Sequence, residues 1–116
     1  MPSYTVNNAT RQTTIGTHVE LAITTHARRI GLLKYEQLEP GHGLGIPARN
    51  WLSFMAIHTI GMKFPIEVLF LDRNNKVIRH CTLPPNRIAW AQGARMVLET
   101  AVGMIDDSGT REGDTI

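Results

Sequence analysis

The residues whose types and spacing could support chemistry gather in one short segment in the middle of the chain. His58 and Thr59 follow an apolar run, and Lys63 comes four residues after Thr59. Gly61 and Pro65 lie in the same segment, which predicts that a strand ends here and that the backbone turns. Polar side chains at such a break can line a cleft while the flanking strands stay rigid.

In a cleft of this kind the polar side chains would have distinct roles. His58 would act as an acid, a base or a ligand, and Thr59 as its hydrogen-bond partner. Lys63 would contact an anion, and Met62 belongs to the same candidate binding set. The alternative is structural, because backbone groups at a strand break also need hydrogen-bond partners, and His58 and Thr59 can supply them. The sequence leaves both interpretations open.

Two carboxylates in apolar surroundings are candidate catalytic partners for His58. Glu67 lies within a strongly apolar segment, and Glu99 lies in a later one. A buried carboxylate needs a partner, and pairing with His58 would shift the pKa of both groups. The alternatives are an outward-facing side chain or an ion pair with an arginine, such as Arg28 for Glu99.

The other histidines and the single cysteine match no known metal or nucleophile motif. The five histidines lack spacings such as HExxH, and there is no second cysteine for a CxxC pair. His58 and Met62, with Met55 nearby, could offer soft copper ligands, but methionine more often fills cores. Cys81 follows His80 within a predicted strand, so their side chains point to opposite faces. We therefore expect no metal and no other cofactor.

The composition indicates one ordinary folded domain over residues 1–116. The hydrophobic fraction is 42% and the charged fraction 19%, as in globular proteins. The net charge is +2 and only Arg28 and Arg29 are adjacent basic residues, so no basic stripe predicts nucleic-acid binding. No apolar run approaches the roughly 20 residues of a membrane span. The polar start and the lone cysteine favour the cytoplasm, or export if a signal was removed.

The spacing of apolar residues predicts a mainly β fold. Strands are predicted at residues 18–24, 51–57, 66–72, 76–83 and 95–100. The run at 66–72 is apolar on both faces, which is typical of a central strand, and an asparagine-rich turn joins it to the next strand. The run at 51–57 is nearly continuous apolar sequence and is predicted to be buried. Six to eight short strands favour a sandwich or a barrel.

The remaining elements are a short helix and several turns. Apolar residues near helical spacing predict the helix from about Thr25 to Leu33, ending before Pro40. Turns are predicted at 107–109 and 113–114.

Three segments together resemble an uncharacterised family known as domain of unknown function 192. They are Thr24 with Arg28 and Gly31-Leu32-Leu33, then IHTIGMKFPIEVLFLD at 57–72, then MVLETAVG at 96–103 with GTREGD at 109–114. The resemblance implies an antiparallel, jelly-roll-like β-sandwich with one short helix, and it brings no established activity. The family often has asparagine where His58 stands and usually aspartate where Glu67 stands. The extra methylene of Glu67 moves its carboxylate relative to that of an aspartate, which argues against a metal-binding or catalytic role that depends on tight geometry.

Three functions follow from these residues. The first is a binding module that presents a cleft near His58, Thr59 and Met62 to a small molecule, a glycan or a partner protein. The second is a small hydrolase or lyase that uses His58 with Glu67 or Glu99, which requires hydrogen-bond reach and a perturbed pKa. The third is a structural oligomer subunit, which requires a large apolar interface.

Overall fold

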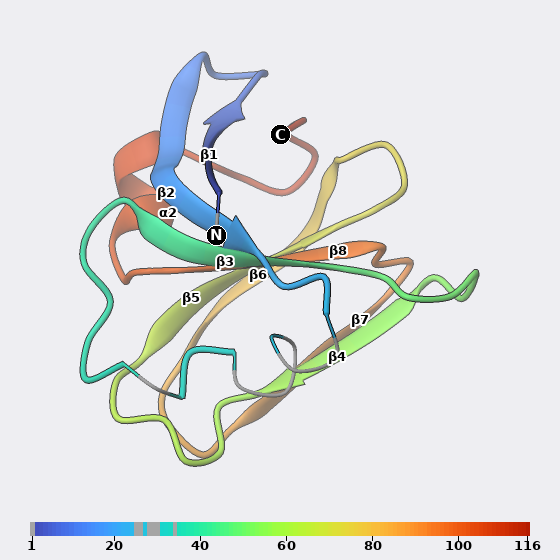
Figure 1. Ribbon diagram of the computed structural model, residues 1–116. Coiled ribbons are helices and arrows are strands. Elements are labelled where there is room, and N and C mark those ends of the chain that lie inside the picture. Colours follow the sequence, from blue (N-terminus) through green and yellow to red (C-terminus); the bar gives the residue numbers. More distant parts are fainter. Residues whose placement is uncertain (1, 25–26, 28–30, 34) are drawn as a thin grey trace.

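Two β-sheets pack face to face in the computed structural model, which describes residues 2–24, 27, 31–33 and 35–116 (Figure 1). The elements are β1 (Ser3–Asn8), β2 (Thr13–Leu21), β3 (His42–Pro47), β4 (Phe54–His58), β5 (Ile66–Leu71), β6 (Val77–Leu83), β7 (Ile88–Gln92), β8 (Met96–Thr100) and the short helix α2 (Met104–Ser108). The larger sheet has the order β1-β2-β3-β8-β5-β6, and the smaller sheet pairs β4 with β7. The predicted mainly β, sandwich-like fold is confirmed.

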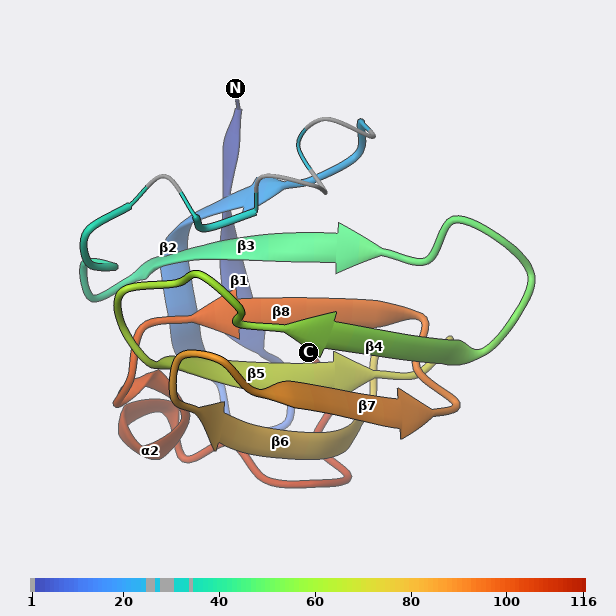
Figure 2. The same ribbon diagram turned by 90° about the horizontal axis from the view of Figure 1, so that it is seen from below.

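Five of the six strand pairings among the described residues are antiparallel, and only β2–β3 is parallel. The smaller sheet lies over β8, β5 and β6 of the larger one (Figure 2). At the other end of the large sheet, β1 and β2 rise away from this sandwich and approach α2 (Figure 1). The large sheet therefore buries both of its faces.

β5 illustrates this burial, since every residue of the strand is buried. Ile66, Val68 and Phe70 point toward the smaller sheet and join the main core. Leu69 and Leu71 point the other way and join a second core with residues of β2 and α2. The predicted central strand is thus confirmed. The hairpin that follows is confirmed too, with Asn75 in the left-handed conformation at φ 60°.

The predicted buried strand at 51–57 is wrong in its bounds and its burial. β4 begins only at Phe54, and the Trp51 side chain before it is 85% exposed. β4 alternates exposed and buried residues because only one face of the two-stranded sheet meets the core. β7 alternates in the same way, but its five residues were too short a pattern to be predicted.

The helical elements also differ from the sequence-based expectation. The helix predicted from Thr25 to Leu33 falls largely on residues outside the described ones. Within the described part, Gly31 donates its backbone N–H to the Ala27 carbonyl at 2.9 Å. The turn predicted at 107–109 is wrong, since α2 runs through Ser108 and ends at a left-handed glycine.

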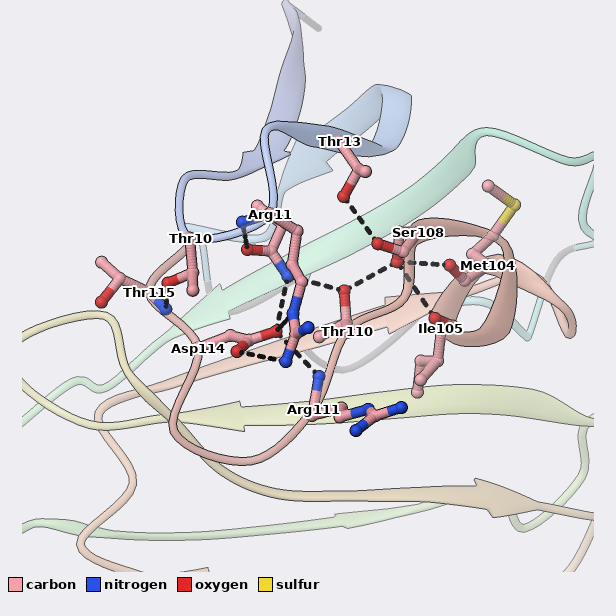
Figure 3. A network of polar contacts seen from close by, with 11 residues as sticks. Thr10, Arg11, Thr13, Met104, Ile105, Ser108, Thr110, Arg111, Asp114 and Thr115 are labelled. Atoms are coloured by element: carbon pink, nitrogen blue, oxygen red, sulfur yellow. Dashed lines mark hydrogen bonds and ion pairs between the residues drawn. The ribbon is translucent and has the colours of Figure 1, made fainter.

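A buried polar network joins the two ends of the chain (Figure 3). The Asn8 amide donates to Thr110 Oγ1 and to Asp114 Oδ2, both at 3.0 Å. The Arg11 Nε and the Arg111 backbone N–H also donate to Asp114, each at 3.0 Å. The hydrogen bonds from Arg11 and Asn8 hold the pKa of Asp114 well below its usual range. The network fixes the β1–β2 hairpin against the segment that follows α2.

Candidate functional site

Thr59 clamps two loops together at the end of β4. Its hydroxyl donates to the Pro84 carbonyl at 2.6 Å and accepts from the Arg87 backbone N–H at 2.9 Å. Its own backbone bonds the Arg87 carbonyl at 2.8 Å and the Asn86 N–H at 2.9 Å. The side chain is fully buried. Thr59 therefore fixes the loop after β4 against the loop before β7, with its hydroxyl already engaged.

His58 lies one residue earlier, at the exposed end of β4. Its Nδ1 accepts the Ile60 backbone N–H at 3.2 Å. In the neutral ring this contact places the proton on Nε2. The imidazole thus helps to shape the turn while its second nitrogen is left for other contacts.

A cavity of about 180 Å³ opens beside β4, between the two sheets. Most of its wall is apolar, with Leu32, Ile46, Met55, Ile57 and Met62. Among the described residues that line it, His58 and Glu99 are the two with titratable side chains. A concave, mostly apolar site with a few convergent polar groups is the usual form of a small-ligand site.

Glu99 is a buried carboxylate in the centre of the large sheet. β8 lies between β3 and β5, where Glu99 is paired with Leu44 on one side and Val68 on the other. Its side chain is only 5% exposed. Among the described residues none forms an ion pair or hydrogen bond with the carboxylate, and burial raises its pKa to about 7. The alternative partner, Arg28, lies outside the described residues.

Glu67 is placed on the opposite face of the same sheet. It is 6% exposed, and its Oε1 accepts the backbone N–H of Ile105 at 2.9 Å, in the first turn of α2. A carboxylate at a helix start satisfies an otherwise unpaired N–H and favours the positive end of the helix. The structure therefore brings Glu99, and not Glu67, to the cavity that His58 lines.

Lys63 points away from this cavity. Its Nζ pairs with Glu36 Oε1 at 2.6 Å, and both side chains are largely exposed, at 55% and 79%. Of the four residues predicted to bind a ligand, His58 and Met62 line the cavity, whereas Thr59 and Lys63 do not.

Most residues of the cavity wall are not predicted from the sequence. Leu32, Ile46 and Ile57 carry no chemical signal that distinguishes a cavity wall from a core. Met55 was considered only as a copper ligand, and the described residues contain no cluster of three or more histidine, cysteine, aspartate or glutamate side chains. The one signal that could have located the cavity is Glu99, a carboxylate within an apolar strand.

The comparisons with known proteins agree on family and fold. The model of the DUF192 family, described as Uncharacterized ACR, matches residues 5–116. A proposed transcription regulator from Sinorhizobium meliloti 1021 has a similar crystal structure, with a TM-score of 0.79 and 22% identity, covering 99% of this chain and 95% of that one. A protein of unknown function from Novosphingobium aromaticivorans DSM 12444 has a TM-score of 0.79 and 21% identity, covering 96% and 80%. At such identities the likeness shows the fold alone.

No curated protein matches the chain. In the described part of the chain, no helix combines the length and the apolar character that crossing a membrane requires.

Proposed function

The chain belongs to the DUF192 family, and on that premise we propose that it is a binding module that holds a small organic cation in the cavity beside His58. The observation that carries the proposal is Glu99, a buried carboxylate in the wall of a mostly apolar cavity. The bound cation would be an ammonium or guanidinium group that pairs with this carboxylate.

The energetics of Glu99 support a cationic ligand. A charge without a partner in an apolar site is costly, and the group stays neutral instead. That cost is seen here as the rise of the Glu99 pKa to about 7. A cation entering the cavity would stabilise the ionised form and form a charge-assisted hydrogen bond. Ligand binding and ionisation of Glu99 are therefore coupled.

The size and walls of the cavity support a short aliphatic cation. Its volume of about 180 Å³ is below the roughly 300–1,000 Å³ of pockets that hold drug-sized ligands. Met55 and Met62 are adaptable side chains that suit an alkyl stem. Among the described strands β4 is paired on one side only, to β7, so its other edge presents backbone groups that have no strand partner. The cationic group could thus belong to a free amine or to a lysine or arginine side chain.

A thermal-shift titration at pH 8 tests the proposal with butylamine, butylguanidine and a capped Gly-Lys-Gly peptide, and with 1-butanol as the uncharged match. Ligands that bind only the folded state raise its melting temperature by mass action, by about 2.7 kcal/mol of stability at 100 times Kd. We expect the cations to stabilise the parent and butanol not to. The peptide and the free amines separate the two sources of the cation.

Two variants locate the effect. Glu99→Gln keeps the shape of the side chain and removes its charge, and it should abolish stabilisation by every cation. Glu36→Gln removes the charge of an exposed carboxylate outside the cavity and should leave the titration unchanged. A cation that stabilises Glu99→Gln as well as the parent would contradict the proposal, as would a parent that responds to no cation in the panel.

A second candidate function has one specific observation in its favour. A general acid or base works best with a pKa near the working pH, and Glu99, at about 7, shares its cavity with His58. A small hydrolase or lyase using these two groups predicts turnover that fails in both Glu99→Gln and His58→Asn. The binding module predicts that His58→Asn alters affinity only, with no turnover in the parent. Steady-state assays with small amides, esters and amines distinguish the two.

A further inference from the structure

The outer face of the β4–β7 sheet gathers most of the exposed apolar side chains. Among the described residues ten large apolar side chains are exposed, and six lie on this face or in the loops that flank it. These six, which we call the outer face, are Trp51, Leu52, Phe54, Ile60, Ile88 and Trp90. Figure 2 views the molecule from the side on which β4 and β7 lie. A contiguous apolar surface of this kind marks an interaction site.

Alternation along the two strands produces the face. Phe54 on β4 and Ile88 and Trp90 on β7 occupy the positions that turn away from the core, while their neighbours are buried. Trp51 and Leu52 extend the surface into the loop before β4, which projects from the molecule in both views (Figures 1 and 2). The Trp51 side chain is 85% exposed. The face therefore ends in a protruding apolar loop.

Arginines outnumber acidic residues around this face, where Asp72 lines a shallow cleft together with Trp51 and Arg95. The sequence has no aspartate or glutamate from residue 40 to 66 or from 73 to 98, the two stretches that contain β4 and β7. The same stretches hold five arginines, at positions 49, 73, 79, 87 and 95. Arg79 lies 5.9 Å from the centre of the Trp90 ring and donates to the Trp90 carbonyl. Arg95 donates to the Leu52 carbonyl at 2.7 Å. This excess of arginines favours an anionic partner for the face.

Among anionic partners, the shape and composition of the face favour one. Two copies of this chain would bring the arginines of one face mainly against those of the other, which disfavours pairing of two copies. Single-stranded nucleic acid is bound mainly by stacking on aromatic rings, whereas half of this face is aliphatic. A lipid surface accommodates both, since tryptophan rings sit at the headgroup level, aliphatic side chains enter the acyl region and basic residues meet anionic headgroups. We propose that the outer face docks peripherally on an anionic phospholipid bilayer.

The chain carries its own reporter for this docking. Its only two tryptophans, Trp51 and Trp90, both lie on the outer face. Titration with vesicles of three parts phosphatidylcholine to one part phosphatidylserine at 0.1 M NaCl should shift the tryptophan emission to the blue, and co-sedimentation should confirm binding. Pure phosphatidylcholine should bind at least tenfold more weakly. Raising NaCl to 1 M, which shortens the Debye length from about 10 to about 3 Å, should release the protein.

Paired variants test which residues carry the binding. Arg87→Gln should weaken vesicle partition about fivefold, the usual contribution of one basic residue near an anionic surface, whereas Arg111→Gln outside the face should not. Leu52→Ser should weaken it at least as much, whereas Val102→Ser, which is equally exposed elsewhere, should not. Glu99→Gln should bind vesicles like the parent, because Glu99 is buried and is not part of the outer face.

Several results would overturn the proposal. One is no emission shift with the phosphatidylserine vesicles at 0.1 M NaCl. Equal binding to neutral vesicles would show apolar adhesion without charge recognition. A shift caused by a thymidine oligonucleotide and not by vesicles would identify nucleic acid as the partner. Self-association without vesicles, seen by sedimentation velocity, would identify a second copy.

Discussion

Replacing Glu99 by glutamine should make the protein more stable, and increasingly so as the pH rises. Burial raises the pKa of Glu99 from 4.5 to about 7, so between these values the folded state holds a proton that the unfolded state has lost. The parent is therefore stabilised by this group at low pH and loses that contribution as the pH rises through 7. At 1.36 kcal/mol per pH unit the whole loss is about 3 kcal/mol.

Glutamine does not titrate, so the difference between variant and parent isolates this group. The advantage of Glu99→Gln should grow by about 2 kcal/mol between pH 5.5 and 8.5, because roughly the last 1.5 units of the titration fall in that window. Urea denaturation at four pH values, analysed by linear extrapolation, measures the difference. Glu36→Gln serves as the exposed control and should differ from the parent by a constant, small amount.

A Glu99→Gln variant that is less stable than the parent at pH 8.5 would refute this reasoning. It would show that the carboxylate is ionised and paired with a basic group, because breaking a buried ion pair leaves an uncompensated charge and costs about 3–5 kcal/mol. The proposed cation site would then be filled by the chain itself. A difference that does not change with pH would equally show that the Glu99 pKa is not raised.

Three further predictions concern the scaffold that positions the site. Thr59→Val should cost about 2–3 kcal/mol in urea denaturation, because it leaves a buried carbonyl and N–H of the neighbouring loops without their partner, whereas Thr59→Ser, which keeps the hydroxyl, should cost less than half as much. Asp114→Asn should lower the melting temperature at pH 7, and its deficit should begin to shrink as the pH falls below 3.8, where the unfolded state takes up a proton, and should vanish only as the pH falls through the depressed folded-state pKa of Asp114; a deficit at pH 2.5 as large as that at pH 7 would contradict this. Gly43→Ala should cost about 1–3 kcal/mol, because its Cβ would lie 2.5 Å from the Glu99 carbonyl oxygen, and a variant as stable as the parent would show that β3 and β8 can separate at this point.

The central strands could be predicted because their burial produces a local run of apolar residues in the sequence. β5 is apolar at five of its six positions, which only a strand buried on both faces requires. β4 and the residues before it show the limit of the same argument. Trp51 and Leu52 have the apolar character of core residues, but they precede a strand of a two-stranded sheet whose outer side is exposed in the described part of the chain. An apolar segment indicates that its side chains are suited to burial, but it does not indicate which part of the structure, if any, covers them.

The site could be predicted only at its edge, because its parts come from distant segments. His58 and Met62 were found from the turn that they share. Glu99 stands out in the sequence as a carboxylate within an apolar strand. Glu67 does as well, and the sequence alone cannot decide which of the two lies near His58, because it does not show which face of the sheet each side chain occupies. The strand register decides this, since Glu67 shares a face with Leu69, and Glu99 shares the opposite one with Val97.

Position 67 gives a physical reason for the departure from the family pattern. The Glu67 carboxylate reaches across to the first turn of α2 and accepts the Ile105 N–H at 2.9 Å. This hydrogen bond requires only that a carboxylate oxygen reach the helix from the strand, and it does not require the precise geometry of a catalytic group. The extra methylene of glutamate is therefore tolerated if α2 shifts to keep the contact. A buried carboxylate with this partner contributes to the position of the helix, whereas Glu99, with no partner among the described residues, is the one left for a ligand. The two acidic residues that looked equivalent in the sequence thus have opposite consequences, and only the face toward β4 holds a candidate site.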